Sequence, residues 1–140
     1  MPAEQRNWYK ITVFNLLVVV SLGVILRYKI AFALPFLDQK NFLQGHSHFA
    51  FAGWITQFLM TALVTYLYRH GQANAFRRYR KLLYANLVTA YGMLISFPIE
   101  GYALVSIVFS TLSIFVSYAF AWYFMKDLKL ISSKEVSKKW

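Results

Sequence analysis

Four long runs of apolar residues alternate with short polar or charged segments along this chain. Crossing the hydrocarbon core of a bilayer takes about 20 helical residues, within a range of about 17–25. The first and third runs reach that length once their aromatic flanks are counted. We therefore predict four transmembrane helices, over residues 11–26, 46–68, 82–97 and 102–125.

Pro98 and Gly101 interrupt the apolar sequence between the last two spans. Proline removes a helical hydrogen bond and glycine is typical of turns, so the pair predicts a tight hairpin instead of one very long helix. Little of the chain remains outside the spans, so helices must carry nearly all backbone hydrogen bonds. The predicted fold class is all-α: residues 1–140 form a single transmembrane domain of four antiparallel helices.

Composition agrees with a chain that spans a membrane. Hydrophobic residues make up 59% and charged residues 14%, compared with about 45–50% and about 25% in soluble domains. One domain of 140 residues cannot hide so many apolar side chains inside itself, because small proteins expose a large share of their surface. The absence of cysteine excludes disulfides, thiolate metal sites and cysteine nucleophiles.

Basic residues gather on one side of the predicted spans. Of the 15 lysines and arginines, all but Arg27, Lys29 and Lys40 lie in the N-terminal end, the loop after the second span, or the C-terminal tail. The positive-inside rule then places both termini in the cytoplasm of a multi-pass protein of the bacterial inner membrane, with the second span running inward. Because this topology explains the basic cluster at 77–81, we expect a lipid bilayer and no nucleic acid as partner.

Two stripes of small residues predict where helices pack. Each stripe occupies one helical face: Ser106, Ser110, Ser113 and Ser117 on the fourth span, and Ala85, Thr89, Gly92 and Ser96 on the third. Small residues let helix backbones approach closely in lipid. Since neither span contains an acid or a base, we interpret both stripes as packing seams and disfavour a transport function.

His46 and His48 stand at the outer end of the second span. An ionisable residue at such a position is costly, and is by default a candidate for function. At helical spacing, His46 shares a face with Ala50, Gly53 and Gln57, while His48 points to nearly the opposite side. The small residues below His46 predict space for a flat group, and the mid-membrane amide of Gln57 needs a partner.

Three interpretations of the histidines remain open. The rings can cap or anchor the helix at the interface. They can hold zinc, iron or copper together with Glu100 or Asp38, although imidazoles two positions apart diverge within a helix. Alternatively, His46 can be an axial ligand of haem b, with its porphyrin lying over small residues. A low-spin haem needs a second ligand from another helix. The third histidine, His70, belongs to the cytoplasmic loop, so that ligand would come from a partner subunit or a second copy.

The stretch Gly45–Trp54 resembles the second transmembrane helix of haem–copper oxidase subunit I, above all its nitric-oxide-reductase-like branch and the related NnrS-type proteins. In that superfamily this helix runs from outside to inside, and a histidine near its outer end ligates the low-spin haem. The resemblance implies that His46, or His48 in an alternative register, ligates haem b for electron transfer. The superfamily's catalytic ligands lie in later helices, so these 140 residues hold no complete catalytic centre and correspond to an oxidoreductase component.

A capping-box pattern at Ser132–Val136 predicts that a further helix starts near the end of the chain, as it would in the leading part of a longer protein. The rival interpretation is a non-catalytic four-helix scaffold or assembly subunit, which docks onto a larger membrane complex through its small-residue seams. Bound haem separates the two, because only the redox protein is coloured.

Overall fold

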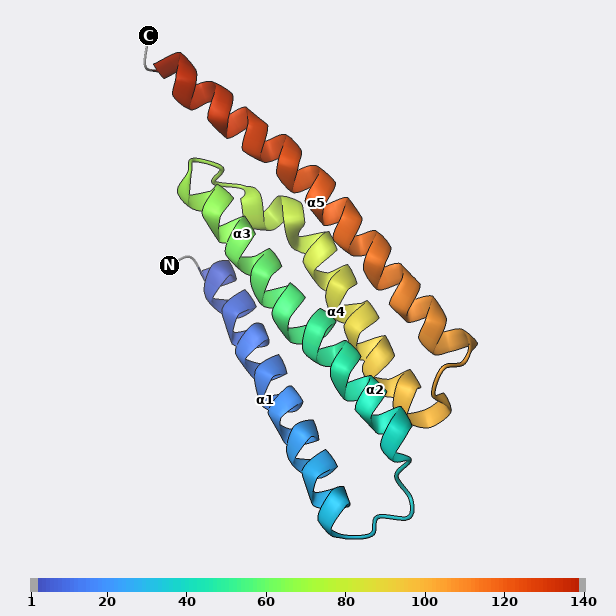
Figure 1. Ribbon diagram of the computed structural model, residues 1–140. Coiled ribbons are helices and arrows are strands. Elements are labelled where there is room, and N and C mark those ends of the chain that lie inside the picture. Colours follow the sequence, from blue (N-terminus) through green and yellow to red (C-terminus); the bar gives the residue numbers. More distant parts are fainter. Residues whose placement is uncertain (1–2, 139–140) are drawn as a thin grey trace.

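The structure is a computed structural model that describes residues 3–138, and these residues form long helices joined by short loops (Figure 1). The first, third and fourth rods are single helices: α1 (Ala3–Ala31), α4 (Ala75–Glu100) and α5 (Leu104–Lys138). The second rod has three consecutive segments: α2 (Gln39–Phe49), the π-helix η1 (Ala50–Thr56) and α3 (Gln57–Arg69). All four rods are long and apolar enough to cross a membrane, which confirms the predicted all-helical class.

Successive rods run in opposite directions, so the segments that join them gather at two ends of the molecule (Figure 1). The N-terminal part of α1, the loop between α3 and α4, and the C-terminal part of α5 lie towards one end, which we call the basic end (residues 3–10, 69–81 and 126–138). The other two connections lie at the opposite end, which we call the histidine end (residues 27–48 and 98–106).

The helices extend beyond the predicted spans. α4 begins at Ala75 instead of residue 82 and continues through Pro98 to Glu100, so the proline does not end the helix. The predicted hairpin is confirmed, but the chain reverses at Gly101, whose φ is 64°. This backbone conformation favours glycine, and a Cβ at this position would lie 2.7 Å from Oδ1 of Asn41, so the side chain of Asn41 would have to move.

One boundary prediction is wrong. The pattern at 132–136 does not start a new helix, because α5 passes through it without interruption as far as Lys138. A capping box stabilises a helix start only where the chain is already bent out of helical geometry. Here the preceding apolar residues carry the helix directly into the tail.

The second and third rods are central, and α1 and α5 are peripheral. In their most apolar stretches, 44% of α2–α3 and 39% of α4 is buried, against 17% of α1 and 11% of α5. α4 packs against α2, η1, α3 and α5, while α1 packs against the second rod. Large apolar side chains such as Val24 and Phe115 point outward from the peripheral helices, where a bilayer would cover them.

The small-residue stripes have two different roles. Gly92 of α4 lies directly under the ring of Phe109, so that any side chain at position 92 would collide with it. This contact confirms a packing seam between α4 and α5. Ser106, in contrast, lies in the first turn of α5 and bonds back to the preceding loop, because its Oγ accepts a hydrogen bond from N of Ala103 at 2.9 Å and donates to O of Gly101 at 2.6 Å.

Candidate functional site

His46 lies in α2 at the histidine end and is half-buried against α1. Its Cε1 is 3.6 Å from the position that a Cβ on Gly23 would occupy, so the imidazole lies beside α1 at this glycine. Nδ1 of the ring is buried and has no hydrogen-bond partner among the described residues, whereas Nε2 is not enclosed in this way. The ring therefore carries one unsatisfied nitrogen inside the bundle and a second that is less enclosed.

His48 faces a different helix. Its ring stacks on Phe97 of α4, with centroids 4.4 Å apart and planes 8° from parallel. Nε2 of His48 lies 3.4 Å from the hydroxyl of Tyr102 in the α4–α5 turn. The two histidines thus diverge, as their spacing along a helix predicts, and His48 is occupied by aromatic packing at the edge of the turn.

The carboxylates predicted to complete a metal site accept hydrogen bonds from nearby backbone N–H groups instead. Oε1 of Glu100 accepts a hydrogen bond from N of Ser106 at 3.2 Å, and Oδ1 of Asp38 caps α2 by accepting from N of Asn41 at 2.7 Å. Within residues 3–138, no group of three histidine, aspartate or glutamate side chains is close enough to hold a metal ion. The predicted set of His46, His48 and Glu100 is therefore not brought together, because the two imidazoles diverge and the carboxylate bonds to the backbone.

The flat slot predicted beside Ala50, Gly53 and Gln57 is filled by protein. Phe49 is fully buried, and its Cε2 lies 2.5 Å from where a Cβ on Gly53 would be, so this ring uses the space that the glycine leaves. Gln57 is also fully buried, and Ala50 is half-buried. Ala50, Gly53 and Gln57 therefore do not form a porphyrin slot within the chain. The ring of Phe49 turns inward and packs edge-on against Tyr91, with ring centroids 4.9 Å apart.

The second rod changes its geometry at the level of this face. Residues Ala50–Thr56 form a π-helix, in which hydrogen bonds span five residues and some carbonyls of the regular ladder lose their usual partners. Two asparagines from neighbouring helices bond to carbonyls of this segment. Nδ2 of Asn86 donates to O of Ala52 at 2.9 Å, and Nδ2 of Asn15 donates to O of Gly53.

The asparagines extend this arrangement into an amide network that joins α1, η1, α3 and α4. Asn86 also donates to Oε1 of Gln57 at 2.9 Å, and the hydroxyl of Tyr91 donates to Oδ1 of Asn15 at 2.8 Å. Irregular backbone at membrane depth is tolerated where protein satisfies it, which is the condition met here. Gln57 has the predicted partner at its Oε1, whereas its buried Nε2 has none among the described residues. The sequence analysis did not find Asn15 and Asn86, although each stands as a polar residue within an apolar run.

A second polar cluster lies at the basic end and was not predicted. Asp127 of α5 is fully buried and forms an ion pair with Nη1 of Arg78 at 2.8 Å. The hydroxyl of Tyr79 donates to its other oxygen, Oδ2, at 2.7 Å. These bonds fasten the extension of α5 to the first turns of α4. In the sequence, Arg78 and Asp127 stand in two separate segments outside the apolar runs, and no pattern there indicates that they pair.

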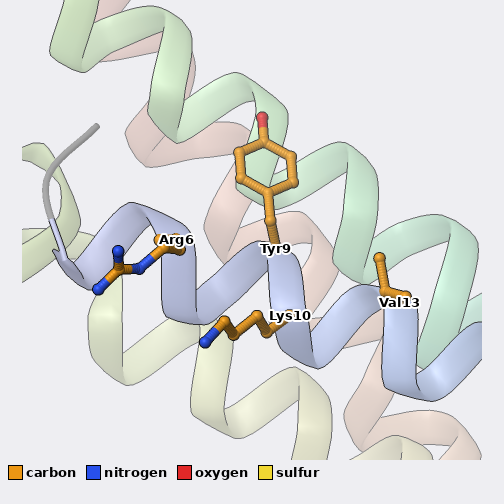
Figure 2. A pocket seen from close by; sticks show the side chains of 4 residues that line it. All are labelled: Arg6, Tyr9, Lys10 and Val13. Atoms are coloured by element: carbon orange, nitrogen blue, oxygen red, sulfur yellow. The ribbon is translucent and has the colours of Figure 1, made fainter.

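Basic side chains also border hollows on the surface at this end. One of these hollows, of about 400 Å³, lies on α1 and is lined by Arg6, Tyr9, Lys10 and Val13. Figure 2 shows these four side chains. Arg6 and Lys10 point away from Tyr9, whose ring extends towards α3 (Figure 2), where its hydroxyl donates to Oγ1 of Thr65 at 3.3 Å. No buried acid holds either cation, since the ion pair between Arg78 and Asp127 is the one that the described side chains form.

Comparisons with protein families, with curated proteins and with solved structures find no match for this chain.

Proposed function

We propose that this chain is a subunit of a membrane redox complex, or the first four spans of one, and that His46 ligates haem b together with a ligand from outside these spans. One observation carries the proposal: the imidazole of His46 is half-buried beside Gly23, with Nδ1 enclosed in the bundle and Nε2 not enclosed in this way. Nε2 is therefore the nitrogen that a group on the outer surface can reach, and a neutral imidazole nitrogen is a common axial ligand of haem iron. The resemblance of Gly45–Trp54 to a haem-ligating helix supports haem as that group.

The filled slot limits where a haem would lie. Phe49 and Asn86 cover Gly53 and Gln57, so the macrocycle has no room inside the bundle. It would instead contact His46 from the outer surface, against a partner subunit or a second copy. When bound, haem would supply the electron-transfer chemistry, while this chain would contribute one ligand and its orientation.

The proposed orientation places both termini in the cytoplasm and the histidine end at the outer face of a bacterial inner membrane. Its support is the clustering of basic segments: residues 3–10, 69–81 and 126–138, which are rich in lysine and arginine, lie towards the same end of the molecule (Figure 1). Arg27, Lys29 and Lys40 are the basic residues of the described segments at the histidine end. Positively charged segments are retained on the cytoplasmic side during insertion.

A reduced-minus-oxidised absorption spectrum tests the haem proposal. The full chain is expressed in bacteria supplied with a haem precursor, and spectra are recorded in membranes and after purification in detergent. We expect α and Soret bands that His46→Ala abolishes. His70→Ala is the matched control, because His70 is exposed at the basic end and bonds to O of Tyr66. Colourless membranes, or bands that persist in His46→Ala, would contradict the proposal; loss of the bands in His48→Ala alone would transfer the ligand role to His48.

A non-catalytic assembly subunit is the second candidate, and the filled slot favours it. In this case Phe49 and the amide network serve only to pack the helices, and another membrane chain covers His46 directly. The expected preparation is colourless, contains no zinc, iron or copper by elemental analysis, and cross-links to a partner in membranes. Cross-linking that His46→Ala leaves unchanged, in a colourless preparation, would support this candidate.

A further inference from the structure

Two adjoining hollows at the basic end share Arg78 and differ in the chemistry of their walls. The outer hollow, of about 310 Å³, is lined by polar and basic residues: Asn74, Arg77 and Arg78. The inner hollow, of about 340 Å³, adds aromatic and apolar walls from α4 and α5: Arg78, Tyr79, Lys81, Leu82 and Tyr123. Polar lining therefore gives way to apolar lining in the direction in which α4 enters the membrane.

Arg78 is held in place from the protein interior. Its Nη1 donates to the buried carboxylate of Asp127, which Tyr79 fixes through its other oxygen. The side chain of Arg78 is nevertheless 53% exposed. A guanidinium has five N–H donors, and a planar fork that remains free can bind a phosphate through two parallel hydrogen bonds. A buried acid thus orients a cation whose other donors face the surface.

The neighbouring cations are not neutralised within the protein. Among the described side chains, only Arg78 has a carboxylate within ion-pair distance, so no carboxylate competes with a ligand for Arg77 or Lys81. Basic hollows between transmembrane helices near the membrane surface are suited to anionic lipid head groups. A free phosphate would contact the cations but leave Leu82 and Tyr123 uncovered.

We propose that the two hollows together bind one anionic phospholipid. Arg78 and Lys81 contact its phosphate, and the rest of the head group occupies the outer hollow. The first segments of its acyl chains pack on Leu82 and Tyr123, in the cleft between α4 and α5. This site is independent of any haem at the opposite end of the bundle.

Native mass spectrometry of the full chain in detergent tests the site. The protein is titrated with dioleoyl phosphatidylglycerol, with the zwitterionic dioleoyl phosphatidylcholine, and with inorganic phosphate. We expect one tightly retained phosphatidylglycerol, bound about tenfold more tightly than phosphatidylcholine, and no displacement by phosphate at millimolar concentration. Lys81→Gln should lower the phosphatidylglycerol affinity about fivefold, as expected for the loss of one cation near the surface.

Two further variants separate a specific site from diffuse attraction by charge. Arg78→Lys retains a cation for Asp127, so the fold is preserved, but it loses the fork and should also weaken phosphatidylglycerol. Arg6→Gln removes the same charge from the hollow on α1, where no buried acid orients the cation, and should change the affinity less than twofold. Equal binding of the two lipids would overturn the proposal. So would an equal loss in Arg6→Gln and Lys81→Gln, or displacement of the lipid by phosphate alone.

Discussion

Asn86→Ala tests whether the amide network stabilises the four-helix bundle. The side chain of Asn86 donates two hydrogen bonds, to O of Ala52 in the π-helix and to Oε1 of Gln57, and all three residues lie in the interior. Hydrogen bonds between transmembrane helices contribute about 0.6 kcal/mol on average and up to about 1.7 kcal/mol. Loss of both bonds, with acceptors left unpaired, should therefore lower the free energy of unfolding by about 1–3 kcal/mol.

The measurement is denaturant-induced unfolding in detergent micelles, followed by tryptophan fluorescence, since Trp8 is buried and reports on packing. Asn7→Ala is the matched control, because Asn7 is exposed on α1, and it should change the free energy by less than about 0.5 kcal/mol. A double-mutant cycle with Gln57→Ala should show coupling of at least about 0.5 kcal/mol. If Asn86→Ala costs no more than the control, or if the two substitutions are additive, the network does not stabilise the bundle.

Three other predictions follow from separate contacts. Gly92→Ala forces a Cβ against the ring of Phe109 and should lower the free energy of unfolding by about 1–3 kcal/mol in the same assay. In the double variant with Phe109→Ala, the total loss should be smaller than the sum of the two separate losses. Simple additivity would show that the two residues do not touch. Asp127→Asn removes the buried charge of the ion pair and should cost about 1.5–3 kcal/mol, unless the α5 extension does not pack as described. The chain has no cysteine, so Ala73→Cys and Phe36→Cys can be labelled singly in intact cells; the proposed topology predicts that a membrane-impermeant maleimide modifies only the cysteine at 36.

The helices and their order were predictable because apolar periodicity and length are set by the bilayer itself. The boundaries were less predictable, since they depend on local competition. Pro98 lies inside α4 near its C-terminal end, and the chain reverses only at Gly101. Gly101 has a positive φ, which glycine adopts without strain. In the same way, polar residues after Ile131 did not end α5, because a helix continues where no residue bends the chain.

The candidate site was predicted only in part. Helical spacing gave the divergence of His46 and His48, and the cost of a buried amide gave the need for a partner at Gln57. Spacing alone does not reveal which side chain fills a gap, so the ring of Phe49 over Gly53 was missed. The buried pairing of Asp127 was missed for a related reason: it joins residues 49 positions apart, and such a contact exists only after the helices have packed.

The π-helix also has a consequence for how this rod can change in evolution. A seven-residue wide turn contains one residue more than a regular helix needs to cover the same rise, as bulges of this kind do. Deleting a single position between 50 and 56 would restore regular geometry and leave the segment that carries His46 facing nearly the same way relative to α3, whereas the same deletion in a regular helix would swing it by about 100°. The wide turn therefore allows the rod to change in length by one residue while the outer imidazole stays beside Gly23.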